Sequence, residues 1–207
     1  MVKAALVFSG VPRLLNQSRV SFLNNLINEN DVDVYSYIWK MQEYAAIPYC
    51  YRHREFEFVE PVNLDSIGVN KFNLYPHWYG VKHACNRFTE YSRNNNLHYD
   101  FVIRTRTDIS LFHPINLNLL DPNLIYISDR HWPGRGTEIF DDNLMILSMD
   151  NYEKIYGHAY DWYINSSNRH TEDVSEAKLA EFVRELGLEN RIVRSPNLDF
   201  ILTRGLF

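Results

Sequence analysis

The chain has 207 residues, of which 45% are hydrophobic and 23% charged, and it carries a formal net charge of -5 at pH 7. This length and composition predict one globular domain over residues 1–207 and exclude an intrinsically disordered chain. The negative charge argues against a nucleic-acid partner, because such a surface needs clustered Lys and Arg to displace counterions from phosphates. Any anionic ligand must therefore be bound by a few basic side chains gathered in one place.

Secretion and membrane insertion are not expected from the sequence. No apolar stretch approaches the roughly 20 residues that span a bilayer. The first residues, MVKAALVFSG, have the pattern of a buried strand rather than of a signal peptide. The two cysteines, Cys50 and Cys85, form neither a disulfide framework nor a metal-binding spacing. We therefore expect a cytoplasmic protein with no membrane span.

The predicted elements alternate between strands and helices along the chain. Residues 3–8 form the continuous apolar run of a strand covered on both faces, and residues 18–30 carry apolar side chains at helical spacing. This order predicts an α/β fold with a mostly parallel central sheet flanked by helices. Further strands are predicted at residues 31–39, 56–60, 99–112, 123–128, 143–148, 191–195 and 199–204, and further helices from Pro76 into the polar run 93–96, over 150–165, and over 173–186 with Gly187 as the cap.

The mid-chain segment YDFVIRTRTDISLF, residues 99–112, begins as a buried strand and then becomes ionic. If it stays extended, Arg104, Arg106 and Asp108 lie on one face, and Ser110 follows on the same face. Guanidinium groups suit phosphate oxygens, and a carboxylate suits a hard cation such as Mg²⁺ or Mn²⁺. The segment therefore predicts an anion site near a strand end. An edge strand with one solvated face, or a purely structural Arg–Asp pair, is the alternative interpretation.

Four segments resemble, in order and spacing, a family of GT-A-type glycosyltransferase-like proteins from bacterial polysaccharide loci and large viruses. The segments are ALVFSGVPRLL, DVDVYSYIW, YDFVIRTRTDISLF and FDDNLMILS, and the resemblance covers most of the chain. It implies a single GT-A-like (Rossmann-like) domain that binds a nucleoside-diphosphate sugar. It also implies transfer of the sugar to a hydroxyl acceptor, such as a glycan or polysaccharide, assisted by Mn²⁺ or Mg²⁺.

The resemblance implies that Ser9, Gly10 and Arg13 line the nucleotide pocket at the end of the first strand. Gly10 would let the backbone approach the ligand, and Arg13 could reach a phosphate; an ordinary tight turn is the alternative for Gly10. Trp132 lies in the loop RHWPGRG, where an aromatic face could stack on a sugar ring or base. These four residues are predicted to bind the nucleotide sugar.

The same resemblance gives the mid-chain residues their roles. Arg104 and Arg106 are expected to clamp the phosphates, although Arg104 could lie too deep and serve Asp108 instead. Asp108 takes the place of the first carboxylate of the Asp-x-Asp metal motif of GT-A enzymes. Ser110 stands where the second carboxylate is expected, so a hydrated ion would be held through Asp108 and, through its hydroxyl or a water, Ser110.

Asp142, which precedes the strand at 143–148, is expected to orient the acceptor hydroxyl or take its proton. Its neighbour Asp141 could fill the same role, because two adjacent carboxylates perturb each other. Glu138 and Glu172 are weaker candidates of the same type. A solvated turn is the structural alternative for Asp142. A sugar-nucleotide-binding or scaffolding module without transfer activity, and less favourably a phosphohydrolase, are the competing functions.

Overall fold

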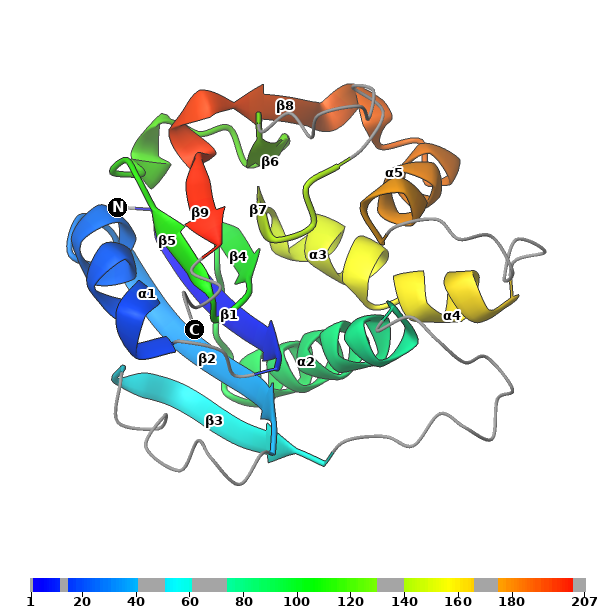
Figure 1. Cartoon of the computed structure of the whole chain (residues 1–207), viewed down its shortest axis with the longest axis horizontal. Coiled ribbons are helices and arrows are strands. Elements are labelled where there is room, and N and C mark those ends of the chain that lie inside the picture. Colours follow the sequence, from blue (N-terminus) through cyan, green and yellow to red (C-terminus); the bar gives the residue numbers. More distant parts are fainter. Residues whose placement is uncertain are drawn as a thin grey trace.

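The structure is a computed structural model, and it describes residues 2–11, 15–40, 51–60, 74–129, 140–165 and 175–202. A seven-stranded sheet forms its centre, with strands in the order β3-β2-β1-β4-β7-β6-β8 (Figure 1). These strands are β1 (Lys3–Gly10), β2 (Asp31–Trp39), β3 (His53–Val59), β4 (Phe101–Thr105), β6 (Ile125–Ser128), β7 (Leu144–Leu147) and β8 (Ile192–Ser195). A second sheet pairs β5 (Ile109–Leu111) with β9 (Phe200–Leu202).

The helices fill the connections between the strands. They are α1 (Leu15–Phe22), α2 (Leu74–Asn94), α3 (Met149–Tyr156), α4 (Ala159–Asn165) and α5 (Ser175–Glu185). A π-helical turn, Leu23–Ile27, continues α1. Within the described ranges, none of the helices combines the length and apolar composition needed to cross a bilayer.

The predicted fold class is confirmed, because the central sheet is mixed but mostly parallel. Strands β1 to β4 run parallel to one another, and β8 runs parallel to β6. Only β7 is reversed, since it pairs antiparallel with both β4 and β6. Strand β1, in the interior of the sheet, is buried from Ala4 to Gly10, which explains its unbroken apolar sequence.

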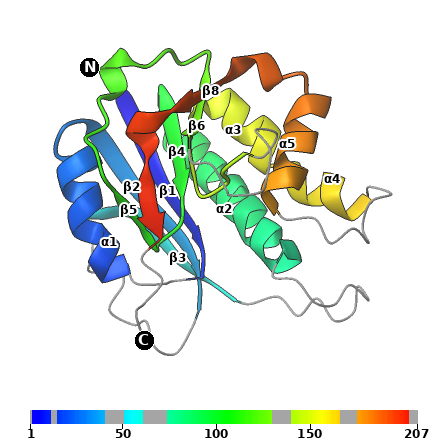
Figure 2. The ribbon, with the colours of Figure 1, turned by 45° about the horizontal axis from the view of Figure 1, so that its top comes forward.

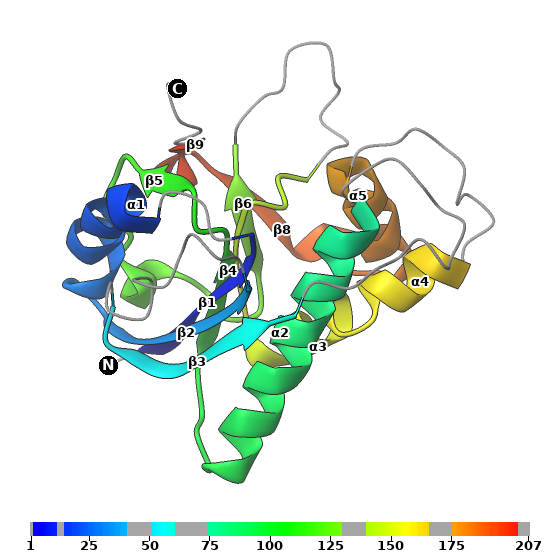
Figure 3. The same cartoon turned by 60° about the horizontal axis from the view of Figure 1, so that its bottom comes forward.

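Two apolar cores cover the sheet, one on each face. On one face α2, α3 and α5 pack against side chains that include Val7 of β1 and Val102 of β4. On the other face α1 and the β5–β9 ribbon cover Phe8 and Ile103, the next residues along the same strands. Figures 2 and 3 show these two layers on opposite sides of the sheet. This alternation decides which face each later residue of β1 and β4 occupies.

The structure corrects two element predictions. The strand expected over 99–112 ends at Thr105, a turn follows at residues 107 and 108, and the chain then enters β5 in the second sheet. The helix expected over 150–165 is divided into α3 and α4 near Gly157. The predicted closing strand is present as β9, which pairs with β5 in the second sheet.

The predicted cap at Gly187 has the expected geometry. Its φ angle is +68°, and the amide of Leu188 donates to the carbonyl of Val183, which closes α5 as a helix end with a left-handed residue does. Cys85 is buried and unpaired with another cysteine. Cys50 lies outside the described residues.

Candidate functional site

The reversed strand β7 determines where the predicted site residues meet. Thr105, the last residue of β4, pairs with Leu144, the first residue of β7. Residues 106–108 therefore leave β4 at the same edge of the sheet at which residues 141–143 enter β7. This edge is the carboxyl end of the parallel strands, where open α/β sheets bind ligands.

Arg106 and Asp108 form a two-pronged ion pair at this edge. Arg106 Nε donates to Asp108 Oδ1 at 2.9 Å, and Nη2 donates to Oδ2 at 2.8 Å. Asp108 is 1% exposed, whereas the Arg106 side chain retains 19%. The turn after β4, rather than the alternation of an extended strand, brings the two side chains together. Asp108 is thus held by Arg106, not by Arg104.

Asn143 connects this pair to Asp141. The third donor of Arg106, Nη1, donates to Asn143 Oδ1 at 3.0 Å. Asn143 in turn donates to Asp141 Oδ1 through its backbone amide at 3.0 Å and through Nδ2 at 2.5 Å. Asp141 is 2% exposed. These bonds fix the two segments that flank the site to each other.

Arg104, His77 and Asp142 form a second group on the α2 face of the sheet. His77 lies in the first turn of α2, and its Nε2 is 3.1 Å from Asp142 Oδ2. The same nitrogen is 3.4 Å from Arg104 Nη2. Arg104 is fully buried, and its guanidinium carbon lies 5.6 Å from the centre of the Tyr156 ring. We call Arg104, Arg106, Asp108, Asp141, Asp142 and His77 the ionic cluster.

Burial and neighbouring charges determine the protonation of this group. Burial lowers the pKa of His77 more than its bond to Asp142 raises it, so the imidazole is neutral at pH 7. Burial would raise the pKa of Asp142, but the hydrogen bond from His77 and the charges of Arg104 and Arg106 hold that pKa well below its usual value. Asp142 is therefore ionised.

The hydrogen-bond directions leave Arg104 incompletely satisfied. A guanidinium only donates and an ionised carboxylate only accepts, so His77 Nε2 must carry its proton toward Asp142. In that tautomer it cannot also accept from Arg104. Among the described residues, no hydrogen-bond partner is present for Nε or Nη1 of Arg104. A buried positive charge with spare donors is costly for folding and favours a nearby anion.

Ser175 and Glu176, at the start of α5, adjoin Asp142. Ser175 Oγ lies 3.1 Å from Asp142 Oδ2 and 3.1 Å from Glu176 Oε2. Burial, followed by the negative charge of Asp142, raises the pKa of Glu176 above its usual value. The site therefore contains two neighbouring carboxyl groups with opposite pKa perturbations.

The residues at the end of β1 border the same edge. Ser9 is 2% exposed and lies on the face of Val7, the face that Arg104 also occupies, since Val7 pairs with Arg104. Its hydroxyl has no hydrogen-bond partner in the described ranges. Gly10 has a φ of +97°, a conformation that favours glycine. Arg13, Trp132, Glu138 and Glu172 lie outside the described residues.

Ser110 does not join the ionic cluster along an extended strand, because the turn at residues 107 and 108 precedes it. It lies in β5 opposite Ile201, on the partly exposed face of that strand. Both oxygens of Asp108 already accept from Arg106. Within the described ranges, no three His, Cys, Asp or Glu side chains gather as metal ligands. The described residues thus do not fit a preformed Mn²⁺ or Mg²⁺ site, and the metal stays a prediction.

Comparisons with known proteins bear on the fold. No family model and no curated protein sequence matches the chain. Solved glycosyltransferase structures do match. The glycosyltransferase GlyE of Streptococcus pneumoniae TIGR4 aligns with a TM-score of 0.50 and 14% identity over 94% of this chain, which spans 45% of that protein. A glycosyltransferase involved in glycosylation of the major capsid of PBCV-1 aligns with a TM-score of 0.54 and 12% identity, over 99% of this chain and 96% of that one.

At these identities the likeness concerns the fold, and it confirms the expected GT-A-like architecture. The chain therefore places its ionic cluster on a scaffold that glycosyltransferases share. Donor, acceptor and metal do not follow from the likeness.

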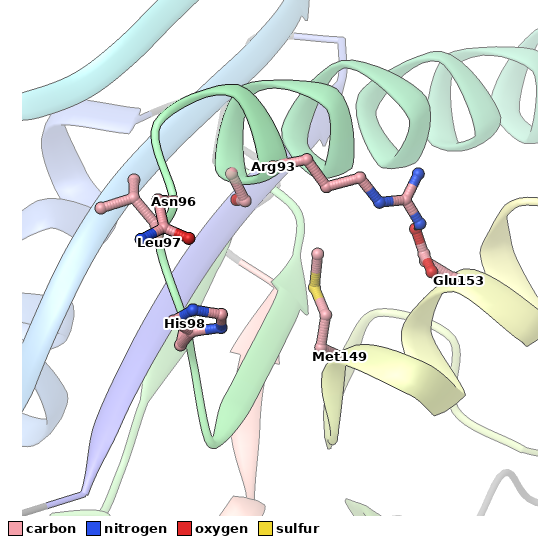
Figure 4. A pocket seen from close by; sticks show the side chains of 7 residues that line it. Arg93, Asn96, Leu97, His98, Met149 and Glu153 are labelled. Atoms are coloured by element: carbon pink, nitrogen blue, oxygen red, sulfur yellow. The ribbon is translucent and has the colours of Figure 1, made fainter.

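A depression of about 300 Å³ lies at the opposite edge of the sheet, between the end of α2, residues 96–98 and the start of α3 (Figure 4). Its two charged residues, Arg93 and Glu153, form an ion pair with each other. Residues 96–98 precede β4, whereas the ionic cluster follows it. This depression is therefore separate from the candidate site.

Sequence reasoning missed His77, Asn143, Ser175 and Glu176. Pro76 predicted the start of α2, and the first turn of that helix lies at the carboxyl edge of the sheet. The position of His77 next to Pro76 could therefore have indicated that it lies near the site. Asn143 directly follows the predicted carboxylates. No pattern in the sequence indicated that α5 would bring Glu176 to Asp142.

Proposed function

We propose that the protein is a glycosyltransferase that moves a sugar from a nucleoside-diphosphate sugar to a hydroxyl acceptor, such as a glycan or polysaccharide. One observation carries the proposal: on a scaffold shared with glycosyltransferases, the ionic cluster gathers at the carboxyl ends of β1 and β4. Ligands bind at this edge in open α/β sheets. The net negative charge of the chain does not prevent an anion from binding at this edge, because the guanidiniums of Arg104 and Arg106 are both fixed there.

The proposed donor side is formed by Arg104, Arg106 and the end of β1. As the bond between the sugar and the diphosphate breaks, negative charge grows on the diphosphate, and fixed positive groups stabilise it without reorganising. Arg106, whose side chain is 19% exposed, is held by Asp108 and Asn143 where it can contact the diphosphate. Arg104 is fully buried against Tyr156 and contributes its positive charge from behind. We assign Ser9, Gly10, Arg13 and Trp132 to the same nucleotide-sugar site.

The proposed acceptor side is the segment that precedes β7. Asp141 is oriented by Asn143, and Asp142 is oriented by His77 and Ser175. Both carboxylates are 2% exposed, so they act by fixing the charge and geometry of this side of the site. No step is assigned to a metal.

A binding or scaffolding module without transfer activity is the second candidate. The observation in its favour is the closed pair of Arg106 and Asp108, which engages the one carboxylate of the metal motif. The two candidates predict the same donor binding and differ in turnover.

The experiment is a thermal-shift screen with UDP-glucose, UDP-galactose, UDP-N-acetylglucosamine and GDP-mannose, in Mn²⁺ and in EDTA, with release of nucleoside diphosphate measured in parallel. A donor at about 100 times its Kd stabilises the fold by about 2.7 kcal/mol, which raises Tm by roughly 5 to 10 °C in a chain of this size. Binding with release supports the transferase, and binding without release supports the module. No shift with any donor refutes both.

The variant Asp108→Ala tests the metal prediction in the same screen. If an ion binds through Asp108, the part of the shift that requires Mn²⁺ disappears in this variant. Asp150→Ala is the matched control, because Asp150 is an exposed carboxylate of α3 whose ion pair within the described ranges is with Lys154. An unchanged Mn²⁺ response in Asp108→Ala removes Asp108 from the site.

A further inference from the structure

We propose that Glu176, in the first turn of α5, accepts the proton of the acceptor hydroxyl, and that Asp142 and Ser175 are positioning residues behind it. This inference rests on the proposed function and deepens it. It assigns the proton to a residue outside the motifs that the sequence offered.

Accessibility distinguishes Glu176 from the carboxylates of the ionic cluster. Asp108 is 1% exposed, and Asp141 and Asp142 are each 2% exposed, whereas Glu176 is only partly buried. An acceptor hydroxyl arrives from solvent, and its proton acceptor must come within about 2.6 to 3.2 Å of the hydroxyl oxygen. Of these four carboxyl groups, Glu176 is therefore the one that an acceptor can approach from solvent.

The single proton of Ser175 links Glu176 to Asp142. Ser175 Oγ is 3.1 Å from an oxygen of each carboxyl group, but its hydroxyl can donate to only one of them. When both groups are ionised, two negative charges therefore face each other across one hydroxyl. A proton on Glu176 completes the chain, since Glu176 then donates to Ser175 and Ser175 donates to Asp142.

The surroundings hold the negative charge on Asp142 and leave the proton to Glu176. Asp142 also accepts from His77, and the guanidiniums of Arg104 and Arg106 stabilise its charge. Among the described residues, the charged groups that act on Glu176 are Asp142 and, more weakly, Asp141, both from the segment before β7. Burial and these charges raise the pKa of Glu176, which makes it a stronger base than an ordinary carboxylate.

The step balances without any further reactant. The acceptor oxygen forms a bond to the anomeric carbon as its proton passes to a Glu176 oxygen. The bond between the anomeric carbon and the diphosphate oxygen breaks, and its electron pair leaves with the diphosphate. Glu176 returns its proton to solvent after product release.

The test compares Glu176→Gln with Glu181→Gln, a matched change on the same helix at a residue that pairs with Lys178. The probes are the four nucleotide sugars named above, with methyl α- and β-glycosides as acceptors. We expect Glu176→Gln to bind the donor within twofold of wild type, to lose between about 10²- and 10⁴-fold in kcat, and to lose the acid limb of the kcat–pH profile. Glu181→Gln should retain both kcat and the limb.

Two further variants separate catalysis from folding. Glu176→Asp keeps a titratable carboxyl group and should recover at least about tenfold of the lost kcat. Ser175→Ala removes the hydroxyl that links Glu176 to Asp142, so the midpoint of the acid limb should shift in this variant and stay in place in Glu181→Gln. If Glu176→Gln keeps the wild-type kcat and acid limb, the inference is wrong and the proposed function stands. If the wild-type protein binds none of the donors, the proposed function and the inference both fail.

Discussion

Replacing Arg106 by methionine should destabilise the fold strongly. The change keeps an apolar chain in place of the aliphatic stem and removes the guanidinium that donates to both oxygens of Asp108 and to Asn143. Breaking a buried ion pair from one side costs about 3 to 5 kcal/mol. We expect about 3 kcal/mol, the lower end, because the 19% exposure of the Arg106 side chain admits water to the pair. This corresponds to a fall in Tm of roughly 6 to 12 °C.

The assay is urea unfolding at pH 7, with the midpoint compared at constant m value. Arg184→Met is the matched control, because Arg184 pairs with Glu189 at 3.1 Å and the two side chains are 36% and 57% exposed. Such a surface pair contributes about 0 to 1 kcal/mol to the free energy of unfolding. Adding Asp108→Asn to the Arg106 variant should recover part of the loss, because it removes the buried charge. If Arg106→Met costs no more than Arg184→Met, Arg106 does not hold Asp108, and that carboxylate is available to a ligand or ion.

Three further predictions concern single residues. Arg104→Met should unfold at the same or a higher urea concentration, since an apolar chain replaces a buried guanidinium with unpaired donors. The same change should weaken donor binding at least about tenfold. A lower urea midpoint with unchanged donor binding would contradict this prediction. Gly10→Ala should cost about 1 to 2 kcal/mol in urea, entirely from its φ of +97°, because a Cβ there meets no atom within 4 Å; an unchanged midpoint would show that the backbone relaxes. The pKa of Glu176 is raised on folding, so the folded state releases its proton later than the unfolded state does, and stability falls as pH rises between those two pKa values. Glu176→Gln should therefore unfold at higher urea than wild type at pH 8, with the difference vanishing near pH 4, and a difference independent of pH would refute the shift.

The parallel half of the sheet could be predicted because each of its strands has a local signature. β1 is buried along nearly its whole length, and its sequence is accordingly an unbroken apolar run. β2 matches its predicted bounds, Asp31–Trp39. Gly187 has the left-handed φ that its position after a helical run predicted. In each case the deciding interaction lies within a few residues along the chain.

The course of the chain after β4 could not be predicted in this way. In an extended chain, residues 105–111 (TRTDISL) would place the ionic and hydroxyl side chains of Arg106, Asp108 and Ser110 on one face, which favours a continuous strand. The structure breaks this strand at Thr107 and Asp108, because the side chain of Thr107 donates to the carbonyl of Val11 and Ile109 packs into the core beneath α1. Both contacts join segments about 90 residues apart, and no local pattern reports them.

The sequence named several residues of the candidate site but not the contacts that they make with each other. Arg106 and Asp108 do meet, but through a turn, and Arg104 turns to His77 instead of to Asp108. The nearness of residues 141–143 followed from the resemblance alone, since periodicity does not reveal that β7 is reversed. Glu176 gave no signal, because its role depends on how α5 packs on the segment before β7.

The reversal of β7 has a practical consequence for redesign. Two stretches, 106–108 and 141–143, are joined by the bond between Arg106 and Asn143 although more than thirty positions separate them in the chain. Grafting either stretch alone from another protein would bring in one partner of this bond without the other. Under the proposed function, a change of donor specificity should exchange both stretches together, as a single module.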